Sequence, residues 1–152
     1  MLLPDVNVLL NAYFIDQPSH EVARQWLDQA LNGSEAVAVA DVVLTGFVRI
    51  AASRAFARPL TRRQAFDACE LIRSARVSLR IPPDNEQWAI FREFAELHAR
   101  TGGDFTDAYL AALAVRNRAQ GVSFDTGFSR FAGLRWVQLR QTPPTTCQAS
   151  MM

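Results

Sequence analysis

The pattern of apolar and polar positions along this chain changes repeatedly between two types. Residues 36–40 form a short run that is apolar throughout, which is typical of a strand buried on both faces of a parallel sheet. Residues 19–31 instead carry apolar side chains at helical spacing, with Val22 and Trp26 on one side. Short strands that alternate with helices of this length predict an α/β fold with a mostly parallel sheet and helices on both faces.

The same criteria, together with capping residues and glycine or proline breaks, divide most of the chain into elements. The predicted strands are 2–4, 36–40, 77–81, 122–124 and 134–139, and the predicted helices are 6–14, 20–32, 42–53, 62–75, 85–101 and 104–120. No internal repeat or linker divides the chain. We therefore expect one domain over residues 1–140, followed by a disordered polar tail over residues 141–152.

The predicted helix 104–120 follows a break at Gly102 and Gly103 and consists largely of small residues. Alanines at this density allow close packing against a sheet or another helix. Asp104 or Thr106 offers an N-cap, so two carboxylates, Asp104 and Asp107, lie at the start of a tightly packed helix. They can serve as helix caps favoured by the helix dipole, or they can belong to a site.

Further carboxylates follow the predicted strands. Asp5, Asp41 and Asp125 each come after a strand, and the carboxyl ends of parallel strands share one edge of the sheet with the starts of the helices. We expect these acids to meet Asp104 and Asp107 there. Like charges gathered in this way need compensation, and oxygen ligands without histidine or cysteine suit Mg²⁺ or Mn²⁺. The matching chemistry is phosphodiester hydrolysis by a metal-activated water. Each acid can alternatively be an ordinary cap, and for Asp41 the cap is the favoured interpretation.

Charge refines this hypothesis. The net charge of +1 does not indicate a nucleic-acid binder, but all 16 basic residues are arginines, and eight of them fall between Arg49 and Arg80. Arginine suits phosphate, so we expect some of these side chains to contact phosphate. Two distant cysteines, Cys69 and Cys147, form no disulfide framework and fit a reducing cytoplasm. The apolar opening is interrupted too early for a signal peptide or a membrane span.

Four segments in order and spacing resemble the PIN-domain family, most closely the VapC-type toxin ribonucleases of bacterial toxin–antitoxin pairs. They are Asp5-Val6-Asn7-Val8-Leu9-Leu10, Leu44-Thr45-Gly46-Phe47-Val48-Arg49-Ile50, Asp107-Ala108-Tyr109-Leu110-Ala111-Ala112-Leu113-Ala114 and Ser123-Phe124-Asp125-Thr126-Gly127-Phe128. The segment from Phe128 to Trp136 is also similar to the usual end of the family. The likeness runs from Leu2 to about Leu139.

The resemblance implies a three-layer α/β/α sandwich and an endoribonuclease that depends on Mg²⁺ or Mn²⁺. It also implies a cytoplasmic homodimer inhibited by a small antitoxin protein, with RNA as the substrate. By position it implies Asp5 and Asp107 as the main metal ligands, Asp125 as a third metal-binding acid that acts directly or through water, a catalytic contribution from Asp104, and bracing of the site by Asn7 and Ser123. We also expect Arg49 to brace the site or to bind substrate.

The chain departs from the family pattern at Gly46, where many relatives have glutamate. Asp41 on the same edge is a possible substitute, and Arg49 can either reach the site or pair with an acid. Gly46 keeps open an alternative function, a catalytically weak or inactive PIN-like module that binds RNA or protein. A phosphohydrolase with an aspartyl intermediate is less favoured, because Asn7 stands where a second aspartate is needed and the chain has no lysine.

The aromatic residues have two interpretations. Trp26, Trp88 and Trp136 are expected in the core rather than as base-stacking platforms. An apolar set on the helices around residues 44 and 66 is a candidate for a dimer or antitoxin surface; it comprises Leu44, Phe47, Ile50, Phe56 and Phe66.

Overall fold

The computed structural model describes residues 1–141. The predicted tail, apart from its first residue, therefore lies outside the described residues. All five strands belong to one sheet, in the order β3-β2-β1-β4-β5, and every pairing is parallel. The strands are β1 (Leu2–Pro4), β2 (Val37–Val39), β3 (Ser78–Arg80), β4 (Gln120–Ser123) and β5 (Arg135–Gln138).

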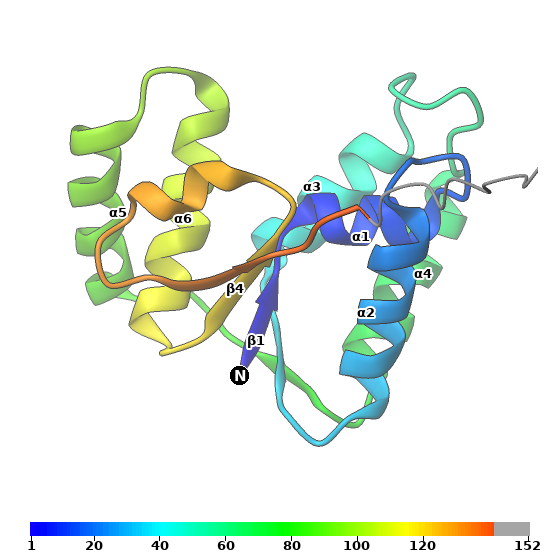
Figure 1. The fold of residues 1–152 in the computed structure, drawn as a ribbon, viewed down its shortest axis with the longest axis horizontal. Coiled ribbons are helices and arrows are strands. Elements are labelled where there is room, and N and C mark those ends of the chain that lie inside the picture. The colour runs from blue at the N-terminus through cyan, green and yellow to red at the C-terminus, as the bar shows by residue number, and fades with distance from the viewer. Residues whose placement is uncertain (142–152) are drawn as a thin grey trace, which may run out of the picture.

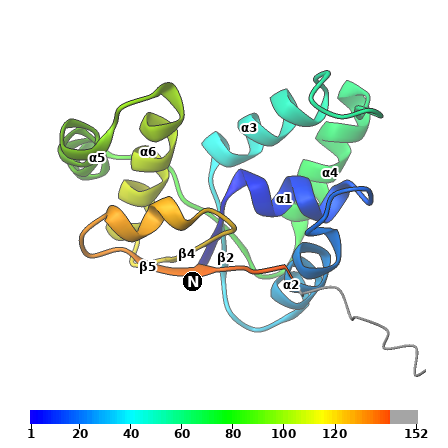
Figure 2. The ribbon, with the colours of Figure 1, turned by 45° about the horizontal axis from the view of Figure 1, so that its top comes forward.

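Helices cover both faces of this sheet. They are α1 (Val6–Tyr13), α2 (His20–Asn32), α3 (Asp41–Ala51), α4 (Arg62–Ser74), α5 (Asn85–His98) and α6 (Gly102–Arg116), with a 3₁₀ helix η1 (Thr126–Arg130) before β5. The pair α5 and α6 lies on one side, and α1 to α4 lie on the other (Figures 1 and 2). The predicted three-layer α/β/α sandwich is confirmed.

The central strands owe their position to their sequence. All three residues of β2 are buried, as the continuous apolar run predicts for an interior strand. The small-residue helix α6 packs closely, and its residues from Ala108 to Ala114 are buried except for Tyr109. Strand β1 joins the two halves because it pairs with β2 on one side and with β4 on the other. Its carboxyl end therefore lies at the middle of the sheet edge.

The predicted bounds of α6 are wrong at both ends. The helix begins at Gly102 with Thr101 as its N-cap, so the two glycines form its first turn and Asp104 is a first-turn residue rather than the cap. It ends at Arg116 because Arg118 has a positive φ of 53° and the Ala119 amide bonds back to the Ala114 carbonyl. Gln120 belongs to β4 instead.

Asp41 is not the predicted cap. The N-cap of α3 is Ala40, no side chain bonds to the free amides there, and Asp41 is the first helical residue. Its carboxylate pairs instead with Arg80 at 2.9 Å and with Arg73 at 3.6 Å. Arg80 lies on β3 and Arg73 on α4, and their guanidinium groups draw the Asp41 side chain away from the amides of α3.

Two predictions about aromatic side chains also fail. Phe47 is fully buried and Leu44 nearly so, because α3 packs its apolar side into the core; Phe66 alone of the proposed set is largely exposed. Trp88 is 60% exposed on α5 rather than in the core, whereas Trp26 and Trp136 pack against the core as expected. Among the residues described, every helix is too short or too polar to cross a lipid bilayer.

Candidate active site

The carboxyl ends of β1 and β4 bring Asp5 and Ser123 together. Asp5 follows β1 and caps α1, because its Oδ1 accepts a hydrogen bond from the Val6 amide at 2.7 Å. Its Oδ2 accepts one from the Ser123 hydroxyl at 2.8 Å. Ser123 is the last residue of β4 and is buried. One carboxylate oxygen of Asp5 is therefore held by the adjacent residue Val6, and the other is held by Ser123, which lies 118 residues later in the chain.

Asn7 braces this contact from the first turn of α1. Its Nδ2 donates to the Ser123 hydroxyl at 3.0 Å, and its Oδ1 accepts from the Phe124 amide at 3.2 Å. The Asp125 amide also donates to the Ser123 oxygen, at 3.0 Å. With both lone pairs of Ser123 engaged, its proton points to Asp5. The predicted bracing residues Asn7 and Ser123 thus lie in one network with Asp5.

Asp125 follows β4 on the same edge and is exposed. Its Oδ1 accepts a hydrogen bond from the Gly127 amide at 2.8 Å, which caps η1. The carboxylate is close enough to Asp5 and Asp107 to raise the pKa of both. Asp125 therefore belongs to the same charged cluster while it also starts the short helix.

Asp107 reaches the cluster from the second turn of α6. Its side chain is 22% exposed, and its Oδ2 lies 3.4 Å from Nη2 of Arg130, the last residue of η1. The same Nη2 donates to Asp104 Oδ1 at 3.1 Å. Two acids on α6 thus share one guanidinium that reaches them from the segment after Asp125.

Asp104 is held differently from the other acids. Its Oδ2 accepts hydrogen bonds from the amides of Arg100 and Thr101 and from the Thr101 hydroxyl, at 2.8–3.1 Å. These backbone bonds, and more weakly Arg130, hold its pKa below the ordinary range. Asp104 is therefore committed to the start of α6 through one oxygen and to Arg130 through the other.

The pKa values of Asp5 and Asp107 are shifted in the opposite direction, upward. Burial raises the pKa of Asp107 to about 6; the charges of Asp5 and Asp125 add to this rise, and Arg130 offsets only part of it. Burial also raises the pKa of Asp5, against the hydrogen bonds from Ser123 and Val6. Three carboxylates therefore repel one another here with incomplete compensation.

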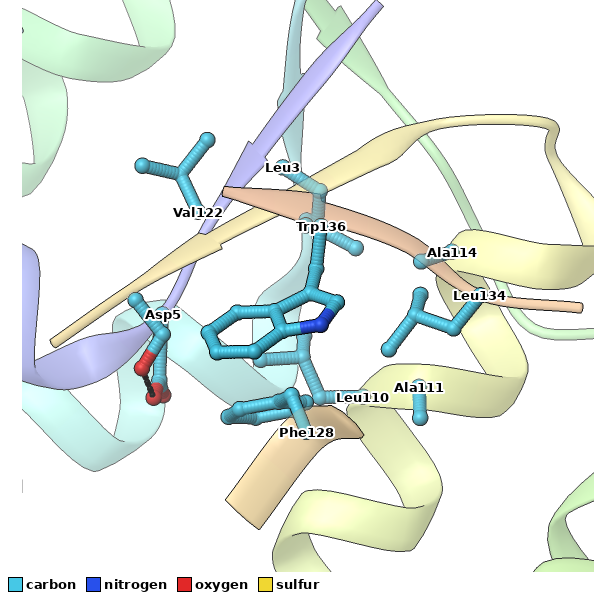
Figure 3. A pocket seen from close by; sticks show the side chains of 11 residues that line it. Leu3, Asp5, Leu110, Ala111, Ala114, Val122, Phe128, Leu134 and Trp136 are labelled. Atoms are coloured by element: carbon cyan, nitrogen blue, oxygen red, sulfur yellow. Dashed lines mark hydrogen bonds between the residues drawn. The ribbon is translucent and has the colours of Figure 1, made fainter. Parts of the chain in front are cut away.

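A small apolar pocket beneath Asp5 explains part of this desolvation. Asp5 lines this pocket together with the rings of Trp136 and Phe128 (Figure 3). The remaining walls come mostly from apolar residues of β1, β4 and α6, and Asp5 is the one charged residue that lines the pocket. An apolar floor of this kind provides no dipoles to solvate the carboxylate, so its charged form is disfavoured.

Two sequence candidates lie away from this cluster. Arg49 is exposed along a groove between α3 and α4, which it lines with Phe66 and Cys69, and makes no ion pair or side-chain hydrogen bond within residues 1–141. Asp41 lines the same groove and forms ion pairs with Arg73 and Arg80. Gly46 brings α3 against α1, since a Cβ there would lie 3.0 Å from Cγ2 of Val6.

The acidic side chains of the cluster match a divalent cation in their chemistry. Asp5, Asp107 and Asp125 offer only oxygen and carry like charges that Arg130 offsets only in part, which suits a hard cation such as Mg²⁺ or Mn²⁺. Over residues 1–141, however, no three Asp, Glu, His or Cys side chains are gathered closely enough to hold a metal as they stand. The chemistry of the residues fits a cation, and the shell is not preformed.

Residues 2–134 match the profile of the PIN domain. The chain belongs to the PIN-domain family. It is 37% identical over 137 residues to VapC ribonuclease Mb2897 of Mycobacterium bovis, covering 90% of this chain and 93% of the relative. It is 38% identical over 140 residues to ribonuclease VapC37 of Mycobacterium tuberculosis, covering 91% and 96%. The predicted family and the predicted VapC-type toxin endoribonuclease are confirmed by these relatives.

Solved structures of PIN-domain toxins share the fold. VapC20 of Mycobacterium tuberculosis, described as a sarcin-ricin loop cleaving toxin, superimposes with a TM-score of 0.67 at 17% identity, covering 89% of this chain and 99% of that one. VapBC2 of Rickettsia felis, bound to a DNA fragment from its promoter, gives 0.66 at 14% identity, covering 91% and 98%. At such low identity these likenesses show the fold alone.

Sequence reasoning missed Arg130. The residue lies in the segment that resembles the end of the PIN domain, yet its role depends on contacts with Asp104 and Asp107, 26 and 23 residues away. A resemblance between segments does not say where a side chain points. Only the path of η1 back across the sheet edge brings the guanidinium to the acids.

Proposed function

We propose that this PIN domain hydrolyses RNA at the cluster of Asp5, Asp107 and Asp125, with Mg²⁺ or Mn²⁺ as cofactor. The observation that carries the proposal is that Asp5, Asp107 and Asp125 lie at one edge of the sheet, after β1, at the start of α6 and after β4; burial and the charges of the other two raise the pKa of Asp107 there to about 6. Three carboxylates on one sheet edge destabilise one another unless a cation is bound, which is the expected electrostatics of a metal-dependent nuclease.

The side chains divide the work between them. Asp5, Asp107 and Asp125 would hold the cation, and Ser123 and Asn7 fix the orientation of the Asp5 carboxylate. When bound, the cation supplies activation of a water and stabilises the charge on the leaving oxygen. Water attacks phosphorus, the ester bond to the ribose oxygen breaks, and the products are a phosphate monoester and a hydroxyl group.

The biological setting is proposed on the same basis. Toxin–antitoxin complexes are among the solved structures that share this fold, including DNA-bound VapBC from Salmonella typhimurium and FitAB bound to the IR36 DNA fragment. We infer a small antitoxin as the partner of this chain, RNA as its substrate, a homodimer as its assembly and the cytoplasm as its location.

The test is cleavage of a panel of structured RNAs by the purified, antitoxin-free protein. We expect cutting in Mn²⁺ or Mg²⁺, none in EDTA, and none by Asp5→Asn with the metal present. A folded protein that binds RNA equally well in EDTA and never cuts would support the inactive binding module instead. Cutting by Asp5→Asn at the wild-type rate would remove Asp5 from the mechanism.

A further inference from the structure

Arg130 is the cation that the acidic cluster already contains. Within residues 1–141 no other basic side chain pairs with Asp5, Asp104, Asp107 or Asp125. Arg73 and Arg80 are engaged with Asp41 instead. An RNA phosphate that approaches this cluster therefore meets one guanidinium and several carboxylates.

The guanidinium is held in position from three sides. Its Cζ lies 4.9 Å from the centre of the Phe131 ring, and its Nη2 bonds to Asp104 at 3.1 Å. Nη1 lies 3.3 Å from the point where a Cβ on Gly127 would stand, so the group packs over bare backbone. The contacts with the Phe131 ring, Asp104 and the Gly127 backbone together preorganise one orientation of the guanidinium, so that binding a ligand in this orientation costs little further side-chain entropy.

The anchor is separate from the metal-ligand candidates. Asp104 receives three hydrogen bonds on one oxygen and presents the other to Arg130. The contact of Arg130 with Asp107 is longer, at 3.4 Å, and depends on a charge that a bound cation would share. Arg130 can thus lose Asp107 as a partner and still be held by Asp104.

Its hydrogen-bonding capacity is not filled. Nε of Arg130 is buried without a hydrogen-bond partner among the described residues, and Nη2 is the one nitrogen with a side-chain acceptor. A guanidinium has five donors in a planar fork that matches two oxygens of a phosphate. The side chain is 29% exposed, so a phosphate can reach its Nη1 and Nη2 end, whereas Nε stays buried.

We propose that Arg130 binds a phosphate of the RNA next to the acidic cluster, and that Asp104 is the positioning residue that keeps the guanidinium there. The inference rests on the proposed function, because it takes Asp5, Asp107 and Asp125 as the site of hydrolysis. Arg130 offsets the repulsion between the carboxylates and the phosphate, and it fixes the position of the RNA strand relative to the site of hydrolysis.

The test measures RNA binding apart from cleavage. The probe is a fluorescein-labelled, mixed-sequence RNA 12-mer, followed by anisotropy in Ca²⁺, a hard cation that oxygen ligands also bind, over a range of salt concentrations; gel electrophoresis checks that the probe stays intact. We expect Arg130→Met to weaken binding about tenfold and to lower the salt slope by about 0.7, the value for one lost phosphate contact on a single strand. Arg130→Lys should fall between. The control Arg24→Met removes an exposed, paired arginine on α2 and should leave binding unchanged.

Mn²⁺ affinity, measured by calorimetry on the same variants, separates phosphate binding from a structural role. Arg130→Met should keep or increase the affinity, because it removes a competing cation. Unchanged RNA affinity and salt slope in a folded Arg130→Met would overturn the proposal, and so would loss of Mn²⁺ binding in that variant.

Asp104 is tested by a double-mutant cycle. Asp104→Asn should weaken RNA binding in the wild-type background and have no further effect in Arg130→Met. Additive losses would show that Asp104 acts only on the helix. Failure of the proposed function is a different result, namely wild-type cleavage by Asp5→Asn, and the binding assay still decides the role of Arg130.

Discussion

At the scale of the residue, what distinguishes this site is how differently its aspartates are solvated. Asp104 receives backbone hydrogen bonds that lower its pKa, whereas burial and like charges raise those of Asp5 and Asp107. The sequence places all of these aspartates at the ends of helices or strands, where an aspartate is expected both as a helix cap and as a catalytic residue. The side-chain partners, which sequence does not give, assign Asp104 to the start of a helix and leave Asp107 poorly compensated.

A pH dependence of stability follows for Asp107. Because its folded pKa is about 6, above the ordinary value of 3.8, the folded state binds the proton more tightly than the unfolded state does. Stability from this group is present below about pH 4 and is lost as the pH rises through 6. Asp107→Asn should therefore stabilise the metal-free protein by about 1–2 kcal/mol at pH 7.5 and by much less at pH 4.5.

Urea unfolding in EDTA at the two pH values measures this difference. Asp28→Asn, which removes an exposed carboxylate paired with Arg24 on α2, is the control and should show little change at either pH. A variant Asp107→Asn that is less stable than wild type at pH 7.5 would mean that the contact with Arg130 outweighs the repulsion.

At the scale of the element, the departure at Gly46 has a structural reason. α3 approaches α1 so closely that a Cβ at this position would press on Val6. We expect Gly46→Glu to cost about 1–3 kcal/mol of folding free energy, since Val6 is short, branched and unable to swing aside. It should not increase cleavage. Gly46→Glu combined with Val6→Ala should recover part of the loss.

Chemical denaturation of the single and double variants tests this account. Thr45→Glu is the matched control, because Thr45 is the exposed neighbour on the same helix and should change stability by no more than about 0.5 kcal/mol. If Gly46→Glu is as stable as wild type and cuts RNA faster, the close packing of α3 on α1 is not what excludes glutamate.

The elements also show how far sequence reasoning reaches. The succession of strands and helices along the chain, and the meeting of Asp5 and Asp125 on one edge, follow from periodicity and from the geometry of parallel sheets. The start of α6 does not, because Gly102 and Gly103 read as a break and yet adopt helix once Asp104 bonds back to Thr101. The pairing of Asp41 with Arg80 and Arg73 likewise depends on tertiary contacts.

At the scale of the whole molecule, the metal-free protein holds three carboxylates that repel one another at one edge of the sheet. We therefore expect cation binding to stabilise the fold. Mn²⁺ at 100 times its dissociation constant should add about 2.7 kcal/mol to the free energy of unfolding. Asp5→Asn and Asp107→Asn should lose most of this gain in thermal unfolding. Asp41→Asn should keep it, because Asp41 is occupied by arginines away from the cluster. An equal gain in all variants would place the cation elsewhere.

The most direct test of the central claim is the RNA cleavage rate of Asp107→Asn beside that of Asp41→Asn. Both residues are aspartates at the same edge of the sheet, but Asp41 pairs with Arg73 and Arg80, whereas the charges of Asp5 and Asp125 raise the pKa of Asp107. In Mn²⁺, under single-turnover conditions and with folding checked by circular dichroism, Asp107→Asn should lose at least about 100-fold in rate, roughly 2.7 kcal/mol of transition-state stabilisation. Asp41→Asn should stay within about twofold of wild type. Cleavage by Asp107→Asn at the wild-type rate would contradict a catalytic site at this cluster.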